Sequence, residues 1–182
     1  MKRLICLCML LLLIFTGAGC EENKPVQEKG APILAAFTAT DLAGNSVNES
    51  IFAGKKLTMV NIWATFCGPC IAEMPELAEL NRSYGEDFQV IGIVIDAGDR
   101  NGNPIPQQYA DAFAIIGQTG ADYRHLLPSP SLYKAYLEKV QAVPETIFVD
   151  ETGHQVGQSY VGAKSLDSWK AIIAELMTTI SS

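Results

Sequence analysis

Hydrophobic and polar positions along the chain fall into runs that predict strands alternating with helices. Residues 57–63 and 88–95 form nearly continuous apolar runs rich in β-branched side chains, which is typical of strands covered on both faces of a sheet. Residues 166–180 instead carry apolar side chains at every third or fourth position, the spacing of an amphipathic helix. These three segments are the clearest elements, and the shorter ones are predicted around them.

Turn-forming residues mark the boundaries between the shorter elements. Gly, Asn and Asp within positions 43–45 and 150–153 predict tight turns between paired strands. Further strands are predicted at residues 33–40, 46–48, 123–127, 145–149 and 155–161, and further helices from residue 68 onward, at 105–118 and at 132–139. This order predicts an α/β protein with a mixed sheet, because strands alternate with helices and the chain ends in a hairpin and a helix.

The N-terminal segment follows a different pattern. Residues 2 and 3 are basic, and residues 4–19 form an apolar run of 16 residues, shorter than the roughly 20 that a membrane-spanning helix needs. This pattern predicts an export signal over residues 1–19. The small residues before Cys20 resemble a lipoprotein signal, which implies cleavage before Cys20 and a lipid on its sulfur. Ordinary cleavage near Ala18, an uncleaved anchor and an unmodified thiol stay open.

Composition and charge narrow the possible classes of protein. Residues 20–31 combine charges with a proline and a glycine and lack apolar periodicity, so they predict a hydrated tether. Residues 32–182 are long enough for one domain with a sizeable core. The chain has 13 basic and 20 acidic side chains, a net charge of −7, and therefore lacks the basic surface expected of a nucleic-acid-binding protein.

The cysteines indicate redox chemistry. Three of the five cysteines lie at or before position 20, so the predicted domain keeps only Cys67 and Cys70. Two cysteines cannot staple a disulfide-rich scaffold, and a four-ligand structural zinc site would also need His125 and His154. A redox-active pair is the simpler interpretation. A copper-handling assembly protein that uses both cysteines and one histidine stays open as an alternative.

The position of the two cysteines gives each sulfur a role. Both lie at a predicted strand-to-helix turn, where unpaired N–H groups and the positive end of the helix dipole favour the thiolate of Cys67. Pro69 fits the first helical turn, which needs no donor at that place. Cys70, three residues on, can attack the mixed disulfide that Cys67 forms with a substrate. We therefore predict Cys67 as the attacking and Cys70 as the resolving sulfur, with two buried inert thiols as the alternative.

A family resemblance rests on the segment Trp63-Ala64-Thr65-Phe66-Cys67-Gly68-Pro69-Cys70. It resembles the active site of the thioredoxin superfamily, and its setting resembles the membrane-anchored extracytoplasmic proteins of the TlpA and ResA type. The resemblance covers residues 32–180. It implies a thioredoxin-like three-layer sandwich, in which helices cover both faces of a mixed central sheet and a β-hairpin extends the N-terminus.

The same resemblance implies an activity, partners and a location. The activity is that of a protein-disulfide reductase, for example in cytochrome c maturation, which works without a bound cofactor or metal. Its electrons would come from a membrane-embedded reductase of the DsbD or CcdA type. Its place would be the extracytoplasmic face of a bacterial cell membrane, held by a lipid on Cys20. A thiol peroxidase of the peroxiredoxin type shares this fold, but two cysteines only two residues apart argue against it.

The resemblance also assigns roles to residues outside the pair of cysteines. Pro144 matches a proline that is cis and faces the cysteines in this superfamily, although most X-Pro bonds are trans. Glu73 matches an active-site Glu of the ResA-like group and would accept the proton of Cys70, the alternative being an exposed helix residue. Asn61 stands where cytoplasmic thioredoxins carry a buried Asp, and it cannot titrate.

A substrate surface is predicted around these residues. Phe66 stands where many relatives have a second Trp, and the backbone of Val143 would pair with an extended substrate. The residues predicted to contact the substrate are Trp63, Phe66, Gly68, Pro69, Val143, Pro144 and Glu145. The two aromatic residues could equally belong to the core.

Overall fold

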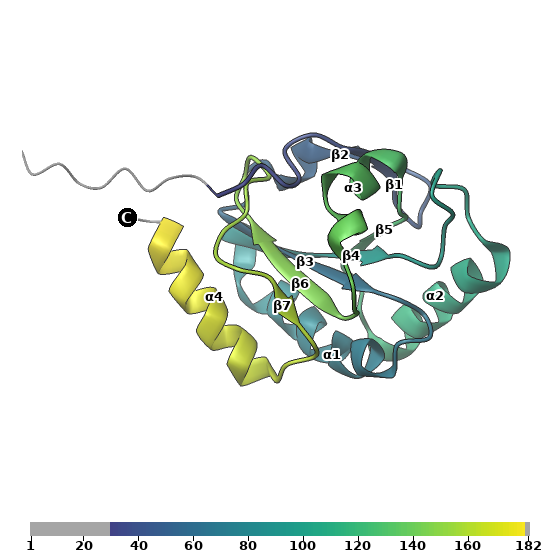
Figure 1. Cartoon of the computed structure of the whole chain (residues 1–182). Coiled ribbons are helices and arrows are strands. Elements are labelled where there is room, and N and C mark those ends of the chain that lie inside the picture. Colours follow the sequence, from purple (N-terminus) through teal and green to yellow (C-terminus); the bar gives the residue numbers. More distant parts are fainter. Residues whose placement is uncertain (1–29, 181–182) are drawn as a thin grey trace, which may run out of the picture.

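A five-stranded mixed sheet forms the centre of the protein, with the strand order β5-β4-β3-β6-β7 (Figure 1). The computed structural model describes residues 30–180, so the predicted signal, most of the predicted tether and Cys20 lie outside the described residues. The strands are β3 (Leu57–Trp63), β4 (Phe88–Val94), β5 (Arg124–Leu126), β6 (Glu145–Val149) and β7 (Tyr160–Val161). β3, β4 and β5 are parallel, and β6 pairs antiparallel with both β3 and β7.

Helices cover both faces of this sheet, which confirms the predicted thioredoxin-like three-layer sandwich. The helices are α1 (Gly68–Ser83), α2 (Pro106–Thr119), α3 (Pro130–Ala135) and α4 (Leu166–Ile180). α1, α2 and α4 pack on one face, where Met74, Ala112 and Trp169 meet side chains of the strands. α3 packs on the other face together with the N-terminal hairpin (Figure 1). Within residues 30–180, no helix is both long and apolar enough to cross a membrane.

The N-terminal hairpin is confirmed, but its first strand is shorter than predicted. β1 (Thr38–Thr40) pairs antiparallel with β2 (Ser46–Asn48) across the predicted turn. Residues 33–37 were wrongly predicted as strand. Ile33, Leu34 and Phe37 are buried in the core without strand pairing, and the backbone N–H of Leu34 donates to the carbonyl of Gly153. Their apolar pattern therefore reflects burial of a loop.

Two further predictions need correction near the C-terminus. The helix predicted at residues 132–139 begins earlier, at Pro130, because the hydroxyl of Ser129 caps it, and a separate 3₁₀ helix follows at Leu137–Lys139. The strand predicted at residues 155–161 is reduced to β7. Gln155 makes only an isolated bridge with Val149, and Gly157 then takes a φ of +70°, which interrupts the pairing before β7. A Cβ at Gly157 would also lie 2.7 Å from Leu176 on α4.

The sheet topology brings four chain segments to one edge. β3 and β4 are parallel and in register from Leu57 with Phe88 to Trp63 with Val94, so they end at the same edge. β6 is antiparallel and begins there, with Glu145 opposite Ile62 and Val161. Consequently the turn after β3, the loop after β4, the start of β6 and the end of β7 all meet around the cysteines.

Candidate active site

The turn between β3 and α1 carries Cys67 and is tied to the loop after β4. The backbone N–H of Thr65 donates to the Asp96 carboxylate at 3.0 Å, and the Thr65 hydroxyl donates to the same carboxylate at 2.5 Å. Sequence reasoning missed Asp96, although an acidic residue directly after a buried apolar strand was a usable signal. These bonds fix the backbone that precedes Cys67.

Cys67 and Cys70 are joined by a disulfide at the start of α1. Cys67 is the N-cap of this helix, and its sulfur accepts a hydrogen bond from the Cys70 N–H at 3.2 Å. This N–H and the helix dipole would stabilise a Cys67 thiolate once the disulfide is reduced. Cys70 is fully buried, whereas Cys67 is 6% exposed, so Cys67 is the sulfur that a substrate can reach. The alternative of two buried inert thiols is therefore wrong, because the two sulfurs are bonded to each other.

Glu73 lies one helical turn after Cys70 and is buried on the same face of α1, at 3% exposure. The alternative of an exposed helix residue is therefore wrong. Burial raises its pKa from 4.5 to about 6, opposed by hydrogen bonds from the Lys164 N–H and the Asn61 amide, while nearby Glu76 adds to the rise. At neutral pH the carboxyl is thus mostly charged, yet basic enough to accept a proton from Cys70.

The raised pKa of Glu73 predicts how its replacement changes stability with pH. Since the folded protein holds this proton more tightly than the unfolded chain, the carboxyl stabilises the fold below about pH 4.5, and that stability is lost as the pH rises through about 6. Glu73→Gln removes this loss. Between pH 4 and pH 7, the free energy of unfolding of Glu73→Gln should therefore gain about 2 kcal/mol relative to wild type. Urea unfolding of the oxidised proteins across this range measures the difference, and two parallel pH curves would contradict it.

The predicted substrate-contacting residues divide into surface and buried groups. Phe66, beside Cys67, is 78% exposed and therefore belongs to the surface. Trp63 is fully buried, which corresponds to the core alternative. Glu145 is also buried, and its carboxylate accepts a hydrogen bond from the Tyr136 hydroxyl. The side chains of Trp63 and Glu145 consequently do not line the surface around Cys67, contrary to the prediction.

The segment before β6 lies beside the redox turn. The Val143–Pro144 peptide bond is cis, as the family resemblance implies. Pro144 directly precedes Glu145, which pairs with Ile62 near the end of β3, so the segment faces the turn that carries Cys67. The Pro144 carbonyl accepts a hydrogen bond from Gly162 at 2.8 Å. The structure therefore brings Val143 and Pro144 to the same edge as Cys67, Gly68 and Pro69.

His125 has both ring nitrogens engaged inside the protein. Its Nε2 lies 3.0 Å from the Ala121 carbonyl and must donate, because a carbonyl only accepts, and its Nδ1 accepts from the Trp63 indole N–H at 3.2 Å. Burial lowers the pKa of His125 to about 4, which keeps the ring neutral. His154 is held by Thr152 in the turn after β6. Neither histidine is placed as a ligand beside the cysteines, so the copper-handling alternative gains no support.

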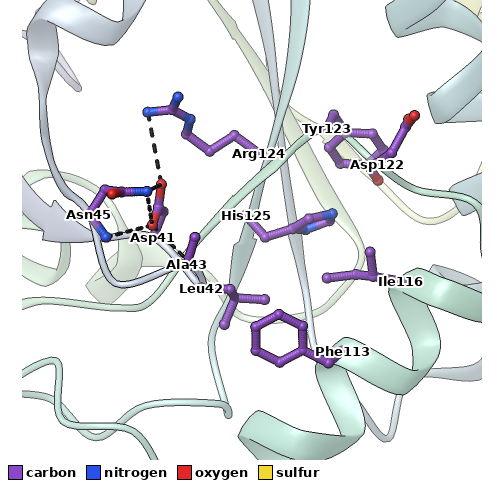
Figure 2. A pocket seen from close by; sticks show the side chains of 10 residues that line it. All are labelled: Asp41, Leu42, Ala43, Asn45, Phe113, Ile116, Asp122, Tyr123, Arg124 and His125. Carbon is purple, nitrogen blue, oxygen red and sulfur yellow. Dashed lines mark hydrogen bonds and ion pairs between the residues drawn. The ribbon is translucent and has the colours of Figure 1, made fainter.

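A pocket of about 510 Å³ opens at the β5 edge of the sheet, between the β1–β2 turn and α2 (Figure 2). Phe113 and Ile116 of α2 line one side, and the His125 side chain lies between them and Arg124 in the view of Figure 2. The residues that line it are Asp41, Leu42, Ala43, Asn45, Phe113, Ile116, Asp122, Tyr123, Arg124 and His125. It includes neither cysteine nor Glu73, and is therefore separate from the redox site.

Among residues 30–180, no three or more His, Cys, Asp or Glu side chains are grouped to hold a metal ion.

Comparison with known proteins places this site in a family. The family model described as Redoxin matches residues 28–172. The thiol-disulfide oxidoreductase ResA of Bacillus thuringiensis is 28% identical over 141 residues, covering 77% of this chain and 73% of that protein. The thiol:disulfide interchange protein HelX of Rhodobacter capsulatus is 28% identical over 169 residues, covering 84% and 83%.

Solved structures support the fold independently. A thiol:disulfide interchange protein of the thioredoxin family from Chlorobium tepidum matches with a TM-score of 0.65 at 20% identity. The match covers 82% of this chain and 96% of that one. Because the shared architecture extends over nearly the whole described chain, the predicted thioredoxin-like fold is confirmed.

Proposed function

The chain belongs to the Redoxin family, and we propose that within it this protein works as a thiol–disulfide oxidoreductase that reduces disulfides of protein substrates. The observation that carries the proposal is the Cys67–Cys70 disulfide at the start of α1, with only the first sulfur reaching the surface. The names of the ResA and HelX relatives, an oxidoreductase and an interchange protein, support the same chemistry.

The reaction proceeds in two exchanges. In the reduced protein, the Cys67 thiolate attacks one sulfur of the substrate disulfide, and the other substrate sulfur leaves as a thiolate. Cys70 then gives its proton to Glu73 and attacks the Cys67 sulfur, which releases the first substrate sulfur. Two electrons pass from the protein dithiol to the substrate, and the protein is left with the Cys67–Cys70 disulfide that the structure contains. A dithiol donor must return these electrons for the next cycle.

The direction of electron flow is tested by the reduction potential. The Gly68-Pro69 dipeptide between the cysteines resembles that of reducing thioredoxins, so we expect a reduction potential of about −270 mV. Equilibrating the protein with thiol–disulfide buffers and alkylating the free thiols measures this value, and insulin reduction tests the activity. A potential near that of strong oxidants, about −120 mV, would exclude the role of reductant.

We also propose where the protein is located and which partners it has. The apolar run of residues 4–19 that leads to Cys20 supports export and a lipid anchor on the extracytoplasmic face of the membrane. A membrane reductase of the DsbD or CcdA type would supply electrons there, and cytochrome c maturation is one process that needs such a reductant. Mass spectrometry of the mature protein tests the anchor, because a free and unacylated Cys20 would reject it.

A further inference from the structure

Asn61 connects two strands to the buried carboxyl of α1. It lies in the middle of β3, is fully buried, and pairs across the sheet with Thr146 of β6. Its side-chain Nδ2 donates to Glu73 Oε1 at 3.1 Å and to the Thr146 hydroxyl oxygen at 3.1 Å. Both N–H groups of one amide are therefore used, one to hold the carboxylate and one to anchor the amide itself.

The second oxygen of the carboxylate is held from another direction. The backbone N–H of Lys164, in the segment between β7 and α4, donates to Glu73 Oε2 at 3.2 Å. Each carboxylate oxygen thus has one donor, and the two donors come from elements that are far apart in sequence. Neither donor belongs to α1. The two hydrogen bonds therefore fix the orientation of the Glu73 carboxylate relative to this helix.

We propose that Asn61 is a positioning residue for disulfide exchange, which holds the Glu73 carboxylate on the face of α1 that carries Cys70. This inference rests on the proposed function. In the resolving step the Cys70 S–H bond breaks and its proton passes to Glu73. The electron pair of the Cys70 sulfur forms the bond to Cys67, the bond from Cys67 to the substrate breaks, and the substrate thiolate takes a proton from water. Asn61 itself neither gains nor loses a proton.

Several other groups around Glu73 affect its pKa or its charge, and a substitution at Asn61 does not remove any of them. Glu76 on the same helix raises the pKa of Glu73, whereas the Trp169 indole on α4 lowers it. Tyr123, just before β5, stays neutral because burial and the Glu73 charge raise its pKa. The Lys164 ammonium lies over the rings of Tyr160 and Trp169. A substitution at Asn61 changes a donor to the carboxylate and leaves all of these groups in place.

The first measurement is the titration of Glu73 in the oxidised protein, followed by NMR of ¹³C-labelled Glu carboxyls. Neither cysteine titrates in that form. The wild-type carboxyl is expected to titrate at about 6. Asn61→Leu removes one charge-assisted donor and should raise this value by about one pH unit. Thr146→Val releases the anchor of the amide and should give a smaller rise. Thr58→Val makes the same change at another buried position, on β3, where the hydroxyl accepts from Gln89, and should give none.

The second measurement is the rate of the resolving step, followed in single turnovers against pH. In Asn61→Leu the acid limb should move up by the same amount as the Glu73 titration, so that the rate at pH 5 falls about tenfold. Asn61→Asp places a second carboxyl beside Glu73, and the pair should titrate in two steps, one of them above the wild-type value. Asn61→Asp and Thr146→Val carry the test if Asn61→Leu does not fold.

Two results would overturn the positioning role. One is a folded Asn61→Leu or Thr146→Val protein in which Glu73 titrates as in wild type. The other is a variant in which the Glu73 titration shifts but the acid limb of the pH–rate profile does not. Asn61 would then change the pKa of Glu73 without affecting the resolving step. Failure of the proposed function looks different: the wild-type protein would not exchange disulfides at all, while the carboxyl titration would still respond to Asn61.

Discussion

Replacing Cys67 with serine is expected to abolish disulfide exchange, with a loss on the order of a thousandfold or more. A serine hydroxyl is not ionised at neutral pH and is a poor nucleophile toward sulfur. Within residues 30–180 the only other cysteine is Cys70, and its sulfur is fully buried and cannot take over the attack. Reduction of insulin by the purified proteins, followed by turbidity, measures the loss. A Cys67→Ser protein that retains a substantial part of the wild-type rate would refute the assignment of the attacking sulfur.

Cys70→Ser should behave differently, although it removes the other half of the same disulfide. Cys67 can still attack a substrate, but the resolving attack is missing, so a mixed disulfide should accumulate on Cys67. Non-reducing electrophoresis and mass spectrometry detect this species and identify the trapped partner. The double variant Cys67→Ser, Cys70→Ser is the matched control and should lose this mixed disulfide. If Cys70→Ser turned over like wild type, the two-step exchange would be wrong.

The redox turn was predictable because its determinants lie close together in the sequence. The apolar run of β3, the two cysteines and Pro69 give the strand, the turn and the start of the helix within 14 residues, and the structure has β3 and α1 where the pattern predicts them. Local signals of this kind suffice when a strand is buried along its whole length, as β3 is.

The surroundings of the turn were not predictable from the same kind of signal. Glu73 is held by the backbone of Lys164, 91 residues away, and Trp63 is bonded to His125, 62 residues away. Such contacts depend on which strands lie side by side, and they leave no periodic pattern along the chain. The burial of Glu145 was missed for another reason: its partner Tyr136 is only nine residues away, but it belongs to an irregular segment between α3 and the following 3₁₀ helix, which has no periodic pattern.

A glycine in the centre of β4 shows how closely these distant contacts are packed. Gly92 pairs with Asn61 on one side and with His125 on the other. A Cβ at this position would lie 2.2 Å from His125 Nδ1 and 3.1 Å from Trp63 Nε1. The hydrogen bond between these two rings therefore occupies the space that any larger residue would need.

Gly92→Ala is accordingly expected to lower the free energy of unfolding by about 3–5 kcal/mol. The methyl group forces the imidazole away, which overpacks the core and leaves buried polar groups of Trp63 and His125 without partners. For a domain of this size the loss corresponds to a fall in Tm of roughly 10 °C. Calorimetry of the oxidised protein measures it. Gly117→Ala is the matched control: this glycine lies in α2 with open space around it, and alanine should stabilise the helix slightly.

A double variant tests whether the clash is the cause. In a His125→Ala background the imidazole is gone, so Gly92→Ala should cost much less there than in wild type, and the two changes should be strongly non-additive. Trp63 is the last residue of β3 and leads into the turn that carries Cys67, so displacement of its indole should also slow disulfide exchange. Equal costs of Gly92→Ala in both backgrounds would show that the Trp63–His125 contact does not explain the glycine.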